Sequence, residues 1–595
     1  MNLFLQVFCS LFSALLCALA IPNEFLTFGS PFLGLIALIP HYLAVSKSAS
    51  FKNAVFLNAL QVMAVHLISS FWLANFRDFA IFTLGASAAG TACIGAFFGW
   101  ILFFPYAKPR TAEKCAPCAK KWGIFAKMRR PYVKTCAAEN VLSRRGIKKI
   151  SYPSFRVLYF SAVWVTWEWV KSNGFLGYPW GTLSMCFYNA KCFIQIADIS
   201  GAYGITFLAL LFSSVCAEGL NLIGSIKNFQ NPKEILSDYK MTAALCVSFF
   251  VLSFAYGVFQ YSKKRIPVKF LNTVIVQQNI DPWGDTDDSL SVMMSKNLSE
   301  QYIEQMRENR ISPDLVVWSE AVLRRPFPQG QNYYKKAPAD EPLINFIDRM
   351  NVPFLVGAPY LLDKKTNSYG NAAVLIDADG IFRGAYSKIH LVPFAEIIPW
   401  VEFKWVAFLM DSLVGFSSSW KEGNQYVLFD IPAHVNPEYE APVAVVSLTE
   451  ELKAPSVKIG TPICFEDAFP KICGNFSKAG CELFVNLTDD SWSRTASAEY
   501  QHFVIAALRS VEFRTPMVRS TNSGYSTVID PAGRVLQDLP LFTPAAASCA
   551  VPVYEKTVTI YERFGNWLAY CCMIFVFLSL CFAAKDGTEN NGTAH

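Results

Sequence analysis

The sequence predicts a polytopic α-helical membrane domain of about eight spans, joined to an extracytoplasmic α/β domain. Of the 595 residues, 53% are hydrophobic and only 16% are charged, whereas soluble domains average about 25% charged residues. Residues 262–565 differ from the rest, because short β-rich runs alternate there with helical stretches. We therefore expect a membrane domain at 1–261, an α/β domain at 262–565, and a final span with a short tail at 566–595. A wholly soluble, disordered or disulfide-rich chain does not fit this composition.

Eight apolar runs approach or reach the roughly 17–25 residues with which a helix crosses a bilayer. The second and fifth are short and need their flanking residues to span. One such run alone could be a buried helix of a soluble protein, but eight together favour a membrane domain. The runs lie near Leu3–Ile21, Pro31–Val45, Ala54–Phe76, Phe79–Tyr106, Val157–Val170, Ile194–Leu222, Met241–Tyr261 and Trp567–Ala584.

The basic residues predict the orientation, because Lys and Arg concentrate in cytoplasmic loops. The window Lys108–Lys149 holds 13 Lys and Arg against two acids, a net charge of +11. Such a block can also mark nucleic-acid binding, but between two apolar runs it favours a cytoplasmic loop. With a cytoplasmic N-terminus, the loops 46–53, 107–156 and 223–240 lie inside and 262–565 lies outside. A signal peptide cleaved after Ala20 is the alternative for the first run, although that run lacks a basic start.

The α/β domain is predicted from β-rich runs bounded by turns and helical stretches. Two tetrapeptides, Asp377–Gly380 and Asp530–Gly533, are typical of tight turns that lead into another strand. Helices are expected at 287–310, 341–350 and 498–513. The expected strands are Thr273–Gln278, Asp314–Trp318, Pro353–Gly357, Ala372–Ile376, Lys458–Cys464, Leu483–Leu487, Met517–Ser520 and Ser526–Ile529.

Three polar residues follow predicted strands or hairpins: Glu320, Lys388 and Cys464. A cysteine becomes a nucleophile near neutral pH with the help of a base and a nearby cation, and a glutamate and a lysine can supply both. Taken singly, each residue also has an ordinary interpretation, as a cap, a solvated charge and a small buried hydrophobe respectively.

The order of these residues resembles the Glu-Lys-Cys triad of the nitrilase (carbon–nitrogen hydrolase) superfamily. The local sequences resemble one membrane-bound branch, the apolipoprotein N-acyltransferases of bacterial envelopes. This resemblance covers nearly the whole chain. The matching stretches are Tyr386–Trp400, Cys464–Glu466, Thr488–Trp492, Gln501–Phe503 and Arg519–Gly524 in the α/β domain, and Trp167–Trp180 and Gly201–Phe207 in the membrane domain.

The resemblance implies a nitrilase-like αββα sandwich on the periplasmic side of the bacterial inner membrane. It implies transfer of an acyl chain from a phospholipid, through a cysteine thioester, to the N-terminal diacylglyceryl-cysteine amine of a lipoprotein. Cys464 would carry the acyl group, Glu320 would be the general base, and Lys388 would stabilise the oxyanion. Glu396 and Glu466 match further family acids that would orient the triad. No cofactor, metal or nucleic-acid partner is implied.

The family also shares an apolar loop over the site, and residues 401–420 match its position. We expect a membrane-facing lid there; a buried amphipathic helix is the alternative. The chain departs from the family pattern at three positions, with Ala395 for glycine, Phe465 for tyrosine and Asp489 for asparagine. Segments 107–156 and 434–457 look like insertions.

Two other functions stay open at this point. A membrane-tethered amidase or nitrilase would use the same triad but let water resolve the acyl-enzyme. A transporter or scaffold with a degenerate domain would not need Cys464 at all. Cysteine spacing leaves a Cys473–Cys481 disulfide undecided, and Cys115, Cys118 and Cys136 are too few for a closed zinc site without a histidine.

Overall fold

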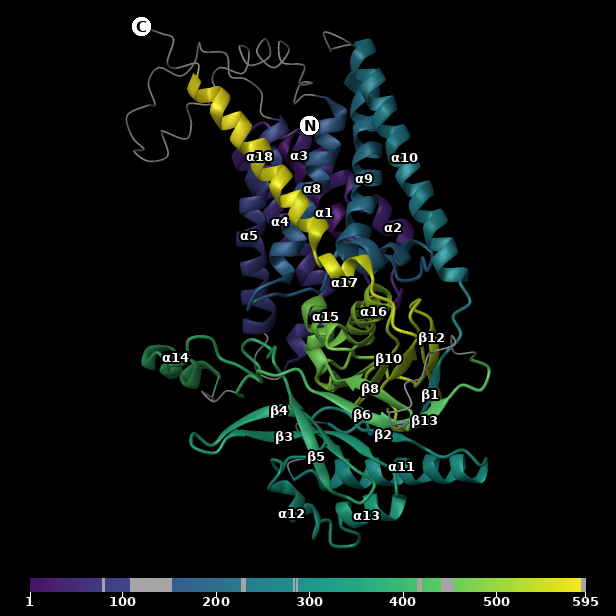
Figure 1. The fold of residues 1–595 in the computed structure, drawn as a ribbon. Helices are drawn as coiled ribbons and strands as arrows, with labels where there is room; N and C mark the ends of the chain where they lie inside the picture. Colours follow the sequence, from purple (N-terminus) through teal and green to yellow (C-terminus); the bar gives the residue numbers. More distant parts are fainter. Residues whose placement is uncertain are drawn as a thin grey trace.

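A computed structural model describes residues 1–76, 81–106, 152–225, 232–281, 284, 287–414, 420–439 and 454–589. It shows a bundle of helices standing on an α/β domain, with the N-terminus at the end of the bundle remote from that domain (Figure 1). Most of the predicted basic insert, with Cys115, Cys118 and Cys136, lies outside the described residues, as does much of segment 434–457.

All eight predicted apolar runs contain helix. Among the described residues, five helical segments are long and apolar enough to cross a membrane: Leu3–Ala20, Phe51–Ser69, Thr83–Phe103, Phe193–Ile223 and Pro232–Ser262. The bundle consists of α1 (Leu3–Ala20), α2 (Pro31–Ile36), α3 (Ile39–Ser46), α4 (Phe51–Ser69), α5 (Ser87–Phe103), α8 (Pro153–Ser172), α9 (Ala197–Ser225), α10 (Pro232–Ser262) and α18 (Trp567–Glu589).

The predicted count of eight spans therefore exceeds what helix length and composition support. The second run divides into α2 and α3, and Pro40 stands in the first turn of α3, where proline is tolerated because its missing N–H is not needed. Helix α8 is long enough, but it carries Arg156, Glu168 and Lys171 and is less apolar than the others. The apolar part of α18, Trp567–Phe582, is short.

The α/β domain contains two sheets packed face to face between two layers of helices, an αββα arrangement (Figure 1). One sheet has the order β13-β1-β2-β3-β4-β5, with β7 pairing β1, and the other has the order β12-β11-β10-β9-β8-β6. Helices α11 (Ser289–Glu308), α12 (Gly330–Tyr334) and α13 (Leu343–Met350) cover the side away from the bundle, and α15 (Pro470–Lys478) and α16 (Ala496–Phe513) cover the side toward it.

The strands agree with the prediction within a few residues, and both turn tetrapeptides connect antiparallel neighbours. The prediction gave no bounds for the strands after the two turns, β5 and β12, and it missed β6, β7 and β13. Strand β13 reads Ala-Ala-Ala-Ser-Cys-Ala-Val-Pro-Val and has little β-propensity of its own; pairing with β1 along its length makes it a strand. The strands are β1 (Lys269–Gln277), β2 (Leu315–Val317), β3 (Phe354–Asp363), β4 (Ser368–Ile376), β5 (Phe382–Ser387), β6 (Leu428–Pro432), β7 (His434–Val435), β8 (Ser456–Gly460), β9 (Leu483–Thr488), β10 (Met517–Thr521), β11 (Thr527–Ile529), β12 (Val535–Asp538) and β13 (Ala545–Val553).

Helix α16 joins the two domains, because it is buried on every side, between the sheets and the bundle. Its buried polar residues need hydrogen-bond partners, and some of these lie in the membrane domain. The Gln501 side chain donates to the carbonyls of Pro22 and Ser69, 2.9 Å away in each case. Arg514, just after the helix, donates to Asp198 at the start of α9, at 2.6 Å. The α/β domain is thus fixed to the bundle rather than tethered by a linker.

Replacing Arg514 with alanine should destabilise the protein strongly. The substitution leaves the buried Asp198 carboxylate without its ion pair, and breaking a buried pair costs about 3–5 kcal/mol. Thermal unfolding of the detergent-solubilised protein measures the effect. Arg349→Ala removes exposed pairs with Glu300 and Glu341 and should cost no more than about 1 kcal/mol. Equal shifts in the two variants would contradict the coupling of the domains through Arg514.

Candidate active site

The three predicted catalytic residues lie where strands of the two sheets end. Glu320 follows β2, Lys388 follows β5, and Cys464 opens a short 3-10 turn after β8. The Lys388 ammonium is almost completely buried and lies 3.1 Å from a Glu320 oxygen and 3.0 Å from Glu396. The structure therefore brings together an ammonium and two carboxylates from positions 68 and 8 residues apart in the chain.

Asn371, in β4, holds the two carboxylates in place. Its side-chain amide donates to Glu320 at 2.7 Å and to Glu396 at 2.9 Å. The second oxygen of Glu320 accepts from the backbone N–H of Asp489 at 3.0 Å, and Glu396 also accepts from the backbone N–H of Val392. Sequence reasoning missed Asn371, because a single amide within a strand gives no signal of its own.

Glu466 ties the segment after Lys388 to the turn that carries Cys464. Its buried carboxylate accepts from the backbone N–H groups of Ile389, His390 and Ile463, at 2.7, 3.0 and 2.8 Å. The Tyr386 hydroxyl donates to it as well, at 2.9 Å. Burial raises the pKa of Glu466 to about 7. Glu466 orients the site through the backbone, since none of these bonds reaches a triad side chain.

Cys464 is partly accessible and has a left-handed backbone, with φ of 49°. Non-glycine residues adopt this conformation at a cost, and such strain is concentrated at functional sites. Burial, followed by the charge of Glu320, raises the pKa of the Cys464 thiol well above its usual value, while the charge of Lys388 lowers it. The resting cysteine is consequently a thiol, and it needs a base before it can attack.

The surroundings of Glu320 and Lys388 raise the pKa of both groups, with different consequences for each. Burial raises the pKa of Glu320, which favours its proton-accepting role near neutral pH. Burial alone would lower the pKa of Lys388, but Glu320 and Glu396 outweigh it and hold that pKa well above its usual range. The lysine therefore stays an ammonium, the form that can stabilise negative charge on oxygen.

A second set of buried charges lies behind the Cys464 turn. The His502 ring lies 2.6 Å from Asp490 and 2.9 Å from Asp467, and Asp467 also pairs with Arg519. Burial would lower the pKa of His502, but the two aspartates raise it to about 10, so the ring is charged. His502 and Arg519 lie in two of the stretches that resemble the family, but the sequence predicts a role for neither residue.

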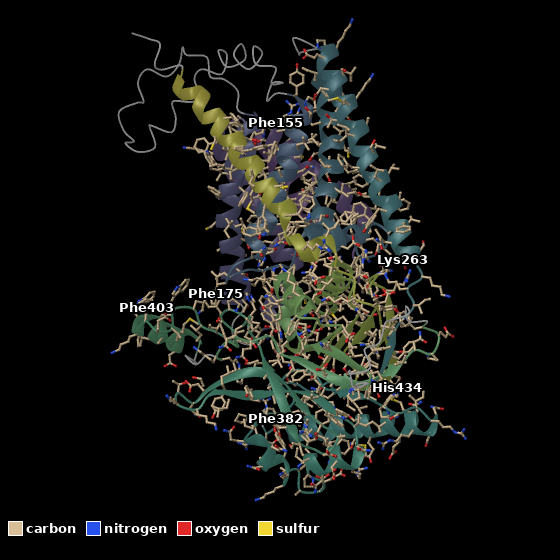
Figure 2. All side chains as sticks on the ribbon, viewed as in Figure 1. Phe155, Phe175, Lys263, Phe382, Phe403 and His434 are labelled. Carbon is tan, nitrogen blue, oxygen red and sulfur yellow. The ribbon has the colours of Figure 1, made fainter. Side chains whose placement is uncertain are left out.

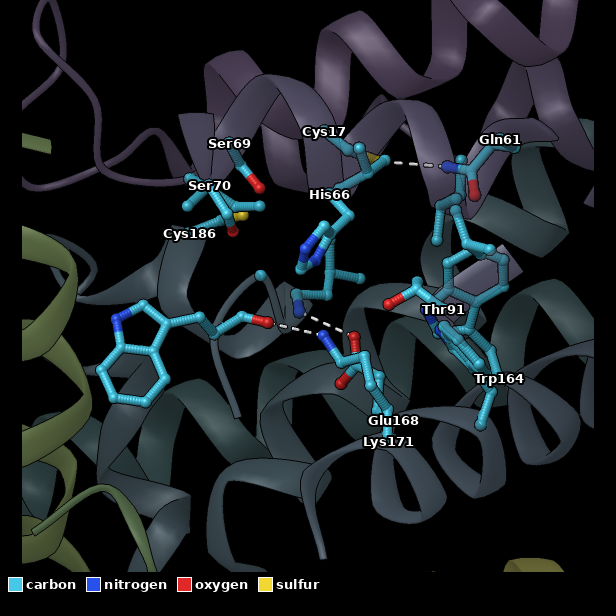
Figure 3. Close-up of a pocket in the computed structure, with 18 residues that line it drawn as sticks. Cys17, Gln61, His66, Ser69, Ser70, Thr91, Trp164, Glu168, Lys171 and Cys186 are labelled. Atoms are coloured by element: carbon cyan, nitrogen blue, oxygen red, sulfur yellow. Dashed lines mark hydrogen bonds between the residues drawn. The ribbon is translucent and has the colours of Figure 1, made fainter. Parts of the chain in front are cut away.

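The membrane domain forms a cover over this turn. The Trp180 ring stacks on Phe465, the residue after Cys464, with ring centroids 5.4 Å apart and planes within 9°. Lys171 of α8 donates to the Trp180 carbonyl at 2.6 Å, and Glu168 accepts from the Leu183 N–H at 2.7 Å. Both side chains line a cavity of about 40 Å³ within the bundle (Figure 3). Glu168 and Lys171, one turn apart on α8, therefore anchor the loop around Trp180 that covers the Cys464 turn.

The predicted lid segment contains the helix α14 (Lys404–Val414), which extends sideways from the body near the ends of the bundle helices (Figure 1). Trp405 and Phe408 are 68% and 75% exposed, and Phe403 points outward at the edge of the molecule (Figure 2). The alternative of a buried helix is wrong for this face. Cys473 and Cys481 are free, which answers the question of their pairing.

Residues 276–553 match the carbon–nitrogen hydrolase family, which is the class of protein that the α/β domain defines. Residues 13–215 match the apolipoprotein N-acyltransferase N-terminal domain. A protein named apolipoprotein N-acyltransferase 2 from Treponema denticola is 39% identical over 98% of this chain and 97% of its own. One of the same name from Treponema pallidum is 36% identical, over 95% and 92%.

The chain therefore belongs to the apolipoprotein N-acyltransferase family and is an acyltransferase. Among solved structures, an amidase from Nesterenkonia sp. aligns with 52% of this chain and 98% of its own, at 14% identity and a TM-score of 0.33.

Glu320→Gln should make Cys464 react faster with iodoacetamide at mildly alkaline pH. The charge of Glu320 raises the pKa of the thiol, so its removal increases the thiolate fraction, roughly tenfold for each pKa unit. Mass spectrometry of the Cys464 peptide measures the rate, with the exposed Glu308→Gln as the control. A slower reaction in Glu320→Gln would instead mean that Glu320 activates the thiol even toward this reagent.

Proposed function

We propose that this enzyme transfers an acyl chain from a membrane phospholipid to the α-amino group of a lipoprotein's N-terminal diacylglyceryl-cysteine, through a thioester on Cys464. The observation that carries the proposal is the buried Lys388 ammonium between Glu320 and Glu396, next to a cysteine that membrane-domain residues cover. The names of the relatives supply the acceptor class.

In the first half-reaction, Glu320 accepts the proton of the Cys464 thiol, and the thiolate attacks the ester carbonyl of the phospholipid. Negative charge develops on the carbonyl oxygen, where the Lys388 ammonium can stabilise it. When the tetrahedral intermediate collapses, the ester C–O bond breaks and a thioester forms. The proton held by Glu320 then passes to the lysophospholipid oxygen.

In the second half-reaction, the acceptor's ammonium must first lose a proton, and Glu320 is placed to accept it. The neutral amine attacks the thioester carbonyl, again opposite Lys388, and an amide forms as the C–S bond breaks. A second proton leaves the nitrogen. One of the two protons returns to the Cys464 sulfur, so the thiol is restored, and the other passes from Glu320 to water, so the base is ionised again. Both halves use the same three groups, which is typical of ping-pong acyl transfer.

The bundle supports a lipid donor and a periplasmic site. The predicted inner loops adjoin the starts of α8 and α10, and these starts lie at the end of the bundle remote from the α/β domain; Phe155 and Lys263 mark the two ends in Figure 2. By the positive-inside rule that remote end faces the cytoplasm. The triad then faces the periplasm of a bacterial inner membrane, beside the headgroups.

An amidase or nitrilase is the second candidate, because hydrolysis and acyl transfer differ only in the second nucleophile. A scaffold is the third. Release of free fatty acid or ammonia without acylation of the acceptor would favour the amidase. Function retained in Cys464→Ala would favour the scaffold.

Incubation with a defined phospholipid should add the mass of one acyl chain to the wild-type protein and nothing to Cys464→Ala. Intact-protein mass spectrometry measures this, and a diacylglyceryl-cysteine peptide should then remove the added mass and become N-acylated. The matched control Cys549→Ala, a partly buried thiol in β13, should behave as the wild type. A correctly folded wild type without any adduct would rule out the lipid donor.

Phe408→Asn should lower turnover with phospholipid in vesicles by more than it lowers turnover with a short-chain, water-soluble ester. Phe408 is exposed on α14, and burying one such ring in the bilayer contributes about 1.5–3 kcal/mol. Lys404→Asn, in the first turn of the same helix, is the control for a change without loss of apolar area. Equal turnover of vesicle lipid by the wild type and Phe408→Asn would contradict a membrane-facing lid.

A further inference from the structure

A fourth carboxylate lies beside the triad, at a position the proposed mechanism does not use. Asp489 follows β9, and its backbone N–H donates to the second oxygen of Glu320 at 3.0 Å. Its side chain is only partly exposed. The structure shows which contacts this side chain makes and which of them need its negative charge.

The hydrogen bonds of Asp489 fix its side chain without using its charge. One oxygen, Oδ1, accepts from the Ser491 N–H at 3.1 Å, from the Ser491 hydroxyl, and from the Asn522 side-chain amide at 3.1 Å. Asn522 also binds the backbone of Ile280 through both its side-chain atoms. An asparagine could make all three bonds through its own carbonyl oxygen, so these contacts hold the turn but do not require a carboxylate.

We infer that Asp489 is a positioning residue whose charge tunes the base Glu320 and so shapes the pH dependence of thioester formation. The inference rests on the proposed role of Glu320. Two carboxylates that share a site resist simultaneous ionisation, and the repulsion acts on both. Burial, together with the charge of Glu320, raises the pKa of Asp489 to about 6. Because repulsion is mutual, the Asp489 charge adds to burial and to the charge of Glu396, which raise the pKa of Glu320.

The other charges around Asp489 do not cancel this effect. Burial, followed by the charge of Asp490, raises the pKa of Glu499 of α16 well above its usual value, so this acid adds no opposing charge, and the exposed Arg494–Asp281 pair is internally balanced. The imidazolium of His502 forms ion pairs with Asp490 and Asp467, which balance its charge. Lys388 lies next to Glu320, where it is shared with Glu396. Asp489 therefore acts on Glu320 mainly by repulsion.

The direction in which the pH profile should move follows from the proposed role of Glu320. Glu320 must be ionised to accept the thiol proton, so the rate of thioester formation rises with pH through the ionisation of Glu320. Removing the Asp489 charge lets Glu320 ionise at lower pH. The acidic limb of the rate profile should consequently move down by on the order of one pH unit or more, because like charges within about 12 Å of each other repel by at least that much at an effective dielectric constant of about 20.

The test is the pH profile of thioester formation on Cys464 in Asp489→Asn, by rapid quench and intact-protein mass spectrometry, from about pH 5 to about pH 8. We expect the acidic limb at lower pH and a plateau close to that of the wild type. Ser491→Ala, which loosens the turn but keeps the charge, should not move the limb to lower pH. The exposed Asp430→Asn should match the wild type throughout.

A rate that falls equally at every pH in Asp489→Asn, with the limb unmoved, would show a merely structural role and overturn this inference alone. A limb that moves to lower pH in Ser491→Ala as well would overturn it too, because the charge would then not be the cause. No thioester in the wild type at any pH would overturn both this inference and the proposed function.

Discussion

The structure of the site depends on one buried ammonium. Lys388 would be unstable as a charge in the protein interior without partners, and Glu320 and Glu396 supply them at 3.1 and 3.0 Å. Glu320 follows β2, and Glu396 lies in the segment after β5. The ion pairs therefore fix the ends of these two strands relative to each other. Asn371 completes the arrangement by bonding to both acids. Loss of the ammonium would leave two carboxylates facing each other.

Residues of both domains surround the turn that carries Cys464. Helix α16 is buried between sheet and bundle, and Trp180 from the membrane domain stacks on the residue after Cys464. A soluble enzyme would present this face to water. Here Trp180 of the membrane domain covers it, which limits the access of water to the Cys464 turn and strengthens the electrostatic interactions inside. The bundle is therefore part of the active site as well as an anchor.

Much of this could be predicted from the sequence, and the failures have physical reasons. Glu320, Lys388 and Cys464 stood out because polar residues at strand ends break an apolar pattern. Asn371 did not, because it sits within a strand, and the His502–Asp467 pair did not, because 35 residues separate partners that only the fold brings together. Pairing with β1 made a strand of the alanine-rich β13. The second apolar run, predicted to be short, spans the helical segment Pro31–Ser46, but the sequence did not show that it divides into α2 and α3, with Pro40 in the first turn of α3.

In the mechanism proposed above, two carboxylates on one lysine balance the charge of the site during the reaction. If the thiol proton passes to Glu320, that acid becomes neutral and a thiolate is formed beside Lys388, so the total charge of the site does not change. The negative charge then moves from sulfur to the carbonyl oxygen, still opposite the same ammonium. Throughout, Glu396 keeps its charge and its bond to Lys388. The ammonium thus always has a fixed partner, which leaves Glu320 free to gain and lose a proton without exposing a buried, unpaired charge.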